Sequence, residues 1–126
     1  MITSKNKQAD FLTEFTDGKY TAECDAPVAK GGADGAFTPM ALLEASLSAC
    51  LNITLRAYAN NHGLELGDVE TTATLKSDDK GTVFEYSAKV PEGIDEEQKK
   101  RLLAALKGCP VHGILSKPIS FELKNS

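Results

Sequence analysis

The longest apolar stretch of the chain constrains its fold more than any other feature. Thr38-Pro39 combines a capping hydroxyl with a proline suited to the first helical position, and Asn61-His62-Gly63 is a typical helix end. The residues between predict a helix over 39–61, roughly 35 Å long at about 1.5 Å per residue. Such a helix exceeds the diameter of a globule of this size and is apolar on nearly all sides. We therefore predict an intertwined homodimer in which two subunits bury each other's long helices.

Length and charge set the class of protein. At 126 residues with 41% apolar and 25% charged residues, the chain fits a single soluble domain over 1–126. A net charge of −4 and the absence of Trp argue against binding nucleic acid. Glu44, Asn52 and Arg56 interrupt the apolar stretch, so it does not predict a membrane span. The N-terminal residues contain no apolar signal segment, and we expect a cytoplasmic protein without a membrane partner.

Three cysteines at spacings of 26 and 59 residues do not form a secreted disulfide framework. Cys50 lies deep in the predicted long helix, where a thiol is usually inert filling. Cys109 precedes Pro110 at a predicted helix start, where backbone N–H groups and the helix dipole favour a thiolate. Cys24 ends a predicted strand and has an expected structural role. From the residues alone, Cys109 is the better nucleophile and thiol redox chemistry is indicated.

The other elements follow from turn and capping signals. The strands around Thr16-Asp17-Gly18 predict a hairpin, and residues 30–36 form a glycine-rich loop. Asp78-Asp79-Lys80-Gly81 predicts a second hairpin, and Asp95 with Gln98 predicts a capped helix that ends at Gly108. The expected elements are strands over 11–14, 19–25, 68–77, 82–90 and 118–123, and helices over 39–61, 95–108 and 109–116. This order predicts an α+β protein with an antiparallel sheet packed against the long helix.

Several polar residues allow both a structural and a functional interpretation. His112 falls one helical turn after Cys109; it is a surface histidine or one half of a Cys–His pair. His62 suits the C-terminal end of the long helix. The scattered His and Cys residues do not predict a zinc site, which needs three or four ligands. A polar stripe on the long helix is solvated, faces an interface or tunes a cysteine; its members are Glu44, Ser48, Asn52 and Arg56.

The two cysteine contexts carry a family resemblance. The specific segments are 31–35 with Thr38-Pro39, 42–50 ending in Ser48-Ala49-Cys50, Tyr58-Ala59 with Gly63-Leu64, and Cys109-Pro110-Val111-His112. With the strand hairpin between the cysteines, the chain from about 11 to 123 resembles the OsmC/Ohr superfamily of osmotically induced and organic hydroperoxide resistance proteins.

The resemblance implies a fold and an activity. It implies an OsmC-like α+β fold and an intertwined homodimer with two active sites at the subunit interface. The implied chemistry is that of a thiol peroxidase of the oxidative stress response, which reduces hydroperoxides, preferentially organic ones, without metal, flavin or other cofactor. Cys50 corresponds to the attacking thiolate and Cys109 to the resolving thiol. A cellular dithiol is the implied reductant.

Two positions depart from the family pattern. Family peroxidases have Glu directly after the proline that starts the helix, where this chain has Met40, and they have an activating Arg in the N-terminal region. No Arg precedes Thr38 in this chain, and Lys30 is the candidate for the activating cation. We therefore expect slow peroxide reduction that accelerates with rising pH. The alternative is a non-catalytic OsmC-fold dimer that binds a small apolar or electrophilic ligand at its interface.

Overall fold

The computed structural model describes residues 1–125, and the chain forms two units, Met1–Glu44 and Ala45–Ser126. The first unit contains a three-stranded antiparallel sheet of β1 (Thr3–Asn6), β2 (Thr13–Thr16) and β3 (Thr21–Cys24), in that order. The predicted hairpin around Asp17 is confirmed, because the Asp17 carboxylate accepts the N–H groups of Lys19 and Tyr20 at 2.8 and 2.7 Å. Both bonds lower the pKa of Asp17, and the bond from Tyr20 has the larger effect. Strand β1 was not predicted from the sequence.

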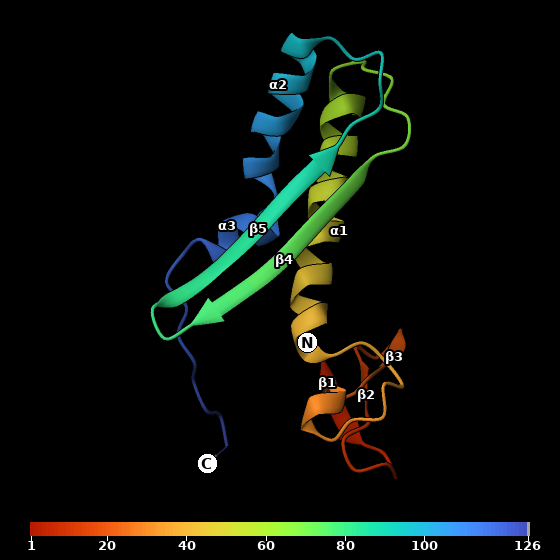
Figure 1. The fold of residues 1–126 in the computed structure, drawn as a ribbon, viewed down its shortest axis with the longest axis vertical. Coiled ribbons are helices and arrows are strands. Elements are labelled where there is room, and N and C mark those ends of the chain that lie inside the picture. Colours follow the sequence, from red (N-terminus) through yellow and green to blue (C-terminus); the bar gives the residue numbers. More distant parts are fainter. Residues whose placement is uncertain (126) are drawn as a thin grey trace. The chain divides into compact units, whose positions relative to one another are not determined.

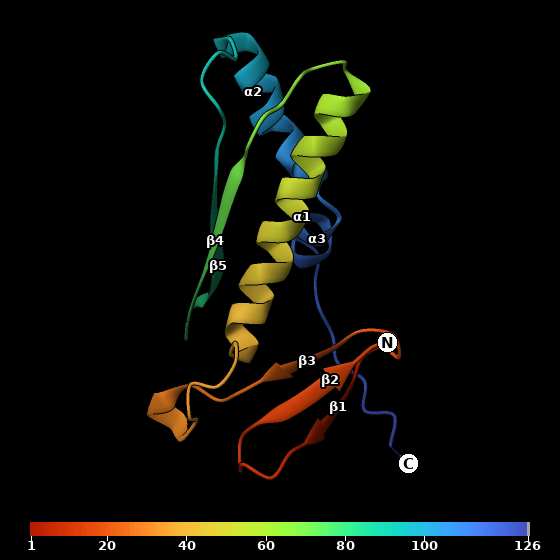
Figure 2. The same ribbon diagram turned by 90° about the vertical axis from the view of Figure 1, so that its right-hand side faces the viewer.

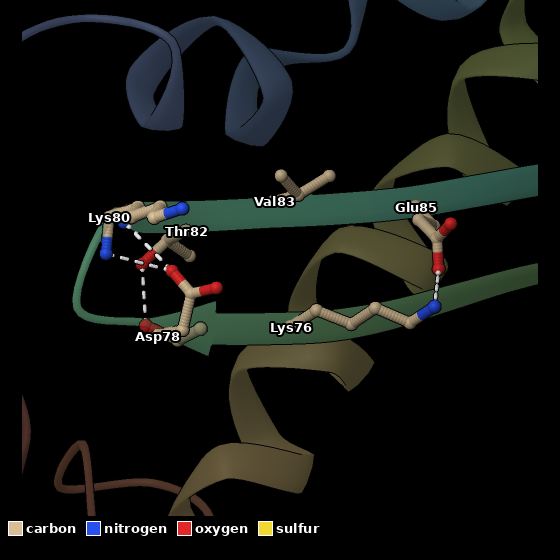
Figure 3. A pocket seen from close by; sticks show the side chains of 8 residues that line it. Lys76, Asp78, Lys80, Thr82, Val83 and Glu85 are labelled. Atoms are coloured by element: carbon tan, nitrogen blue, oxygen red, sulfur yellow. Dashed lines mark hydrogen bonds and ion pairs between the residues drawn. The ribbon is translucent and has the colours of Figure 1, made fainter.

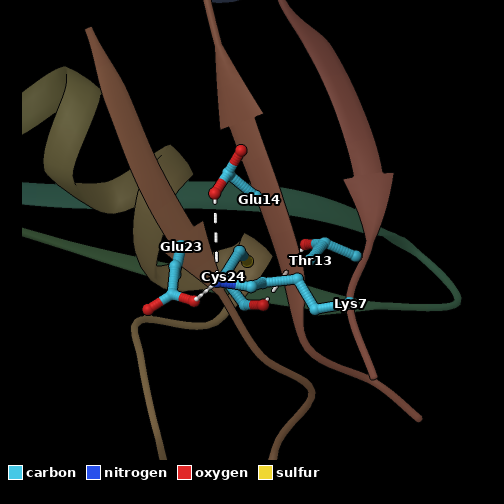
Figure 4. A network of polar contacts seen from close by, with 5 residues as sticks. All are labelled: Lys7, Thr13, Glu14, Glu23 and Cys24. Atoms are coloured by element: carbon cyan, nitrogen blue, oxygen red, sulfur yellow. Dashed lines mark hydrogen bonds and ion pairs between the residues drawn. The ribbon is translucent and has the colours of Figure 1, made fainter. Parts of the chain in front are cut away.

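One surface of this small sheet carries an ion-pair network (Figure 4). The Lys7 ammonium lies 2.8 Å from the Glu23 carboxylate and 3.8 Å from that of Glu14. Thr13 donates a hydrogen bond to the carbonyl of Cys24 at 3.2 Å. Exposed pairs of this kind contribute little to stability, so the network is a surface feature of the sheet.

The glycine-rich loop is organised around a buried carboxylate. Asp25 is only 4% exposed, and its carboxylate accepts the N–H groups of Ala26, Ala33 and Gly35. A Cβ on Gly32 would lie 1.7 Å from a carbonyl oxygen, so this close backbone approach requires glycine. The loop includes a short 3₁₀ helix, η1 (Val28–Lys30), which ends at the exposed Lys30.

The long helix is confirmed at both ends. Helix α1 (Pro39–Asn61) begins where the Thr38 hydroxyl accepts the N–H of Ala41, and it ends before Gly63, which has a φ of +63°. Its buried residues recur every fourth position at Leu47, Leu51, Leu55 and Ala59. Within one chain only this stripe is fully covered, which is less burial than the apolar sequence of the helix requires.

A long hairpin lies against α1 in the second unit (Figures 1 and 2). Strand β4 (Glu70–Asp78) pairs antiparallel with β5 (Gly81–Lys89) across the predicted turn. Alternate residues face the helices and pack on the core; they include Ala73, Phe84, Tyr86 and Ala88. The period-2 pattern of the sequence is therefore confirmed as a hairpin with one covered face.

Two shorter helices complete the second unit. Asp95 caps α2 (Glu96–Ala105) by accepting the N–H of Gln98 at 2.7 Å, as the sequence predicts. A 3₁₀ turn, η2 (Leu106–Gly108), leads through Cys109 into α3 (Pro110–Leu115). The buried Leu102 and Leu106 bring this segment onto the core of α1.

The polar stripe of α1 has a structural role. Ser48 and Thr71 exchange hydrogen bonds of 2.9 and 2.8 Å, and the Asn52 amide donates to the Val69 carbonyl at 3.0 Å. Arg56 donates to the carbonyls at positions 66 and 67. Three of the four residues thus bind residues 66–71, up to the start of β4, which corrects the prediction of a solvated stripe.

The predicted strand over 118–123 is wrong in this structure. Neither described sheet contains the segment, so its backbone groups have no ladder partner. Its alternating side chains stay exposed, at 58% for Ile119, 95% for Phe121 and 86% for Leu123. Alternation gave the segment strand propensity, but a strand also needs the edge of another strand.

Candidate active site

The fold brings two cysteines from distant parts of the sequence into contact. Cys50 lies in the middle of α1 and is half-buried, while Cys109 is the N-cap residue of α3 and is 1% exposed. No disulfide joins them in this structure, and a hydrogen bond from the Cys109 thiol acts on the Cys50 sulfur. Sequence spacing could not reveal this contact, because it depends on how η2 and α3 pack against α1.

The first turn of α3 supplies a backbone donor to each sulfur. The N–H of Val111 donates to the Cys50 sulfur, and the N–H of His112 donates to the Cys109 sulfur at 3.4 Å. These are N–H groups that a helix leaves without an internal partner at its beginning. Donors of this kind stabilise a thiolate more than a thiol, so one helix terminus acts on both cysteines.

The two thiols have pKa shifts of opposite direction. Burial raises the pKa of Cys50. Hydrogen bonds from Cys109, the Val111 N–H and Thr54 lower it, and together they exceed the effect of burial, so the pKa of Cys50 lies below its usual value. Burial raises the pKa of Cys109, and donation of its proton to Cys50 raises it further, against the N–H groups of His112 and Val111. Of the two thiols, Cys50 is therefore the more acidic and Cys109 the less acidic.

This result changes the ranking that the sequence alone favours. An N-cap position favours a Cys109 thiolate, yet near-complete burial and the neighbouring Cys50 shift its pKa the other way. Cys50 lies too far along α1 to feel the helix's own N-terminus, and its donors come from α3 and from Thr54. Helical spacing places Thr54 one turn after Cys50, so the sequence could have indicated this donor. No such signal points to Val111, which is in another helix.

His112 interacts with the second unit's hairpin through its ring. Its Nε2 lies 3.4 Å from the Tyr86 hydroxyl, and the two rings meet edge to face at a centroid distance of 5.5 Å. Its Nδ1 lies 3.4 Å from the Ser116 hydroxyl. The backbone of His112, and not its ring, forms its hydrogen bond to Cys109, so these contacts favour a structural histidine over the alternative of a Cys–His pair.

The other candidate residues belong to other elements. Lys30 is in η1 of the first unit, and its activating role stays a prediction. Arg56 is bonded to backbone carbonyls, so it is not available as the first partner of a cysteine. Cys24 is buried at the end of β3, where its backbone pairs with Thr13.

A hollow of about 570 Å³ at the tip of the hairpin has no comparable chemistry (Figure 3). Lys76 and Glu85 form a cross-strand ion pair at 2.7 Å, and Asp78 accepts the N–H groups of Lys80 and Gly81. These groups satisfy one another and stabilise the turn.

Two further observations concern the described residues. Within residues 1–125, no three His, Cys, Asp or Glu side chains gather in a way that could hold a metal ion. None of the helices in the same range combines the length and hydropathy needed to cross a bilayer.

The chain therefore combines an α+β fold with two neighbouring thiols, one on a long helix and one at the N-terminus of a short helix. These features define a class of cysteine redox protein. Residues 31–124 match the sequence model of the OsmC-like protein family, and the chain belongs to this family. No curated protein sequence matches it. The resemblance found in the sequence is thereby confirmed at the level of the family.

Solved structures share the fold. An organic hydroperoxide resistance protein OsmC from Legionella pneumophila is 24% identical, with a TM-score of 0.69 and coverage of 92% of this chain and 88% of that one. The organic hydroperoxide resistance protein of Elizabethkingia anophelis is 22% identical, with a TM-score of 0.68 and coverage of 91% and 86%. An OsmC-like protein from Mycoplasma pneumoniae is 18% identical, with a TM-score of 0.71 and coverage of 91% and 85%.

Proposed function

We propose that the protein is a thiol-dependent peroxidase that reduces hydroperoxides, preferentially organic ones, through Cys50 and Cys109. The observation that carries the proposal is the hydrogen bond between the two thiols, which leaves Cys50 with a lowered pKa and Cys109 with a raised one. A thiolate beside a protonated resolving thiol is the arrangement that peroxide reduction followed by disulfide formation requires. Membership of the OsmC-like family supports the same chemistry.

The reaction has three balanced steps. The Cys50 thiolate attacks the terminal oxygen of ROOH, the O–O bond breaks, and the protein holds a sulfenic acid while RO⁻ takes a proton from solvent. The Cys109 sulfur then attacks the Cys50 sulfur, the S–O bond of the sulfenic acid breaks, and the hydroxide leaves as water with the Cys109 proton. A cellular dithiol reduces the resulting disulfide by exchange and is itself oxidised to a disulfide.

The activating cation of the proposed site is Lys30. The chain has no arginine before Thr38, and an ammonium does not reproduce a bidentate guanidinium. We expect slow turnover that rises with pH until Cys50 is fully ionised. Lys30→Met should slow the reaction and shift this rise to higher pH, whereas Lys19→Met should not. An unchanged rate and profile in Lys30→Met would remove Lys30 from the site.

We also propose that the functional unit is a homodimer formed by the α1 helices. The face of α1 opposite its buried stripe is exposed and apolar at Ala45, Ala49, Ile53 and Ala57, with Ile53 68% exposed. Apolar surface of this extent on a central helix is typical of an interface. Ile53→Glu should give a monomer by light scattering, and Val83→Glu on the exposed face of β5 serves as the control. A monomeric wild type at micromolar concentration would contradict the dimer.

Both units are proposed to belong to one OsmC-like domain, since the family match runs from 31 to 124 across their boundary. The proposed location is the cytoplasm. Three cysteines whose spacings do not form a secreted disulfide framework suit a compartment in which thiols are kept reduced.

Turnover of cumene hydroperoxide with dithiothreitol tests the proposed activity. Wild type should consume the peroxide catalytically, Cys50→Ser should lose at least about a hundredfold in rate, and Cys24→Ser should retain wild-type turnover, since only a thiolate at position 50 can attack. Equal rates for wild type and Cys50→Ser would overturn the proposal.

A second candidate is a non-catalytic dimer that binds a small apolar or electrophilic ligand at its interface. The observation that favours it is the replacement of the family's activating residues, with Met40 after the helix-starting proline and no arginine before Thr38. Wild type without turnover, but with a Cys50 that is alkylated faster than an ordinary thiol, would favour this function over the peroxidase.

A further inference from the structure

The positive charge of the chain is concentrated in one stretch of the second unit. Residues 98–121 include five Lys or Arg residues and no Asp or Glu, so this segment has a net charge of +5. The rest of the chain has nine cations and 18 carboxylates, a net charge of −9, which leaves the whole at −4. A charge asymmetry of this kind is typical of a protein with a surface for a charged partner.

Three of these cations lie together on α2 and on the turn that follows it. Lys99, Leu103 and Lys107 are spaced by four residues, so they share one side of the helix that continues from α2 into η2, and Lys100 adjoins this side. All three lysines are exposed, whereas buried leucines of the same helix attach it to the core. We call the three lysines the basic surface.

The helix itself does not account for the basic surface. A helix dipole stabilises cations within about its last turn, and Lys99 and Lys100 stand before the last turn of α2. The ion pair on this helix joins Arg101 to Glu97 at 2.9 Å. Among residues 1–125, no carboxylate lies within ion-pair distance of the three lysines. Their ammonium groups are therefore available to a partner.

The basic surface ends next to the thiol pair. Lys107 stands two residues before Cys109, which is at most about 7 Å between Cα atoms. Cys109 caps α3 and its thiol is hydrogen-bonded to the Cys50 sulfur. A protein bound on the basic surface therefore lies beside the two thiols.

The composition of the segment narrows the kind of partner. A helix that lies on a membrane needs a broad apolar face, but Leu102 and Leu106 are buried in the core and Leu103 is only 39% exposed. Binding of single-stranded nucleic acid needs stacking side chains, and residues 98–120 include no Phe, Tyr or Trp. Exposed lysines instead speed the encounter with an acidic protein, more than they strengthen the complex.

We propose that the basic surface of Lys99, Lys100 and Lys107 is the docking surface for an acidic protein that delivers a dithiol to the Cys50–Cys109 disulfide. The role of the partner as reductant rests on the proposed peroxidase function, whereas the surface rests on the distribution of charge. Because that disulfide has to be reduced in every cycle, a partner that arrives quickly and leaves again is the kind that the reaction needs.

The delivery step is a balanced thiol–disulfide exchange. One thiol of the partner attacks the disulfide, loses its proton and forms a mixed disulfide, and one cysteine of the pair leaves. The second thiol of the partner then attacks the partner's own sulfur in the mixed disulfide, and the other cysteine leaves. The partner is oxidised to a disulfide, and its two protons return Cys50 and Cys109 to thiols.

A redox-inactive peptide tests the surface by itself. The probe has a Ser-Gly-Pro-Ser centre flanked by glutamates and is titrated into the full-length protein at low ionic strength, while NMR follows the backbone amides. Saturable shifts at Lys99, Lys100 and Lys107 are expected, and the same peptide flanked by lysines should produce none. No shift from the glutamate peptide, shifts confined to other residues, or equal shifts from both peptides would overturn the proposal.

The dithiol form of the probe tests delivery. The Cys50–Cys109 disulfide is formed with diamide, and its reduction by Cys-Gly-Pro-Cys peptides flanked by glutamates or by glutamines is followed in a single turnover. At low ionic strength the glutamate peptide should react about tenfold faster, the lower end of the effect of electrostatic steering. The advantage should be lost at about 1 M salt, which screens exposed charges beyond roughly 3 Å. An advantage that persists in high salt would contradict the docking surface.

Two triple variants locate the effect. The first has glutamine at all three lysines of the basic surface and should lose the advantage of the glutamate peptide. The second, with Lys5→Gln, Lys19→Gln and Lys80→Gln, removes the same charge from exposed positions of other elements and should retain the advantage. Comparing each variant with wild type for the same peptide cancels the intrinsic reactivity of the dithiol. An unchanged advantage in the first variant, or equal losses in both, would overturn the proposal.

The basic surface and the peroxidase proposal can fail separately. If wild type does not turn over cumene hydroperoxide but the glutamate peptide binds at the basic surface, the peroxidase function is wrong and the surface is a docking site for an acidic protein. If turnover with dithiothreitol is present but the charge of the peptide affects neither binding nor rate, the docking surface is wrong and the peroxidase proposal stands.

Discussion

The end of strand β3 and the contact between α1 and α3 each contain a buried cysteine, and the two regions differ in what surrounds the sulfur. Cys24 is 6% exposed in a strand whose backbone is paired with Thr13. Cys109 is 1% exposed, but its sulfur accepts the His112 N–H and its proton is donated to Cys50. Similar burial thus accompanies two kinds of thiol. Polar partners, and not depth, distinguish a cysteine prepared for chemistry from one that fills space.

The largest expected difference between the two regions is in oxidation. One equivalent of cumene hydroperoxide should remove two of the three thiols, because a Cys50 sulfenic acid is in contact with Cys109 and condenses with it. Peptide mapping should find the Cys50–Cys109 disulfide and leave Cys24 reduced. In Cys109→Ser the oxidation should stop at a sulfenic acid, trapped by dimedone at position 50. A disulfide that contains Cys24 would remove the distinction between the regions.

The next effect concerns the proton shared by the pair. Replacing Cys109 by Ala removes a hydrogen bond that lowers the pKa of Cys50, so that pKa should rise and less thiolate should be present at neutral pH. The rate of Cys50 alkylation by iodoacetamide, measured against pH in a Cys24→Ala background, should then fall off at a higher pH. Cys109→Ser, which retains an O–H donor, should lie nearer to the wild type. Coincident profiles for all three proteins would show that the thiol contact does not activate Cys50.

How much of this site the sequence predicts depends on how local each feature is. The bounds of α1 are set by Thr38-Pro39 and Gly63, and the cap of α3 by Cys109 itself, so both follow from short motifs. The acidity order of the thiols does not, because it depends on burial and on donors from another element. The failed strand over 118–123 has the same cause, since alternation is local and a partner edge is not.

Cys24 should matter for the stability of the fold and not for the reactivity of Cys50. Cys24→Ala removes a buried sulfur from the first unit and should lower the free energy of unfolding by about 1 kcal/mol, the typical cost of a buried substitution. It should leave the alkylation rate of Cys50 unchanged. Urea denaturation and the alkylation profile measure the two effects on the same protein. A change in Cys50 reactivity would link Cys24 to the site and contradict its structural role.

The smallest expected effect is that of Thr54, which sharpens the comparison within α1. Its hydroxyl is one of the donors that lower the pKa of Cys50, yet the same hydroxyl lies 2.8 Å from the Cys50 carbonyl and carries only one proton. Because that proton is divided between two acceptors, Thr54→Val should raise the pKa of Cys50 less than Cys109→Ala does. Thr54→Ser retains the hydroxyl and should restore the wild-type alkylation profile. If Thr54→Val leaves the profile unchanged, the hydroxyl serves only the backbone, and the activation of Cys50 comes from Cys109 and the first turn of α3.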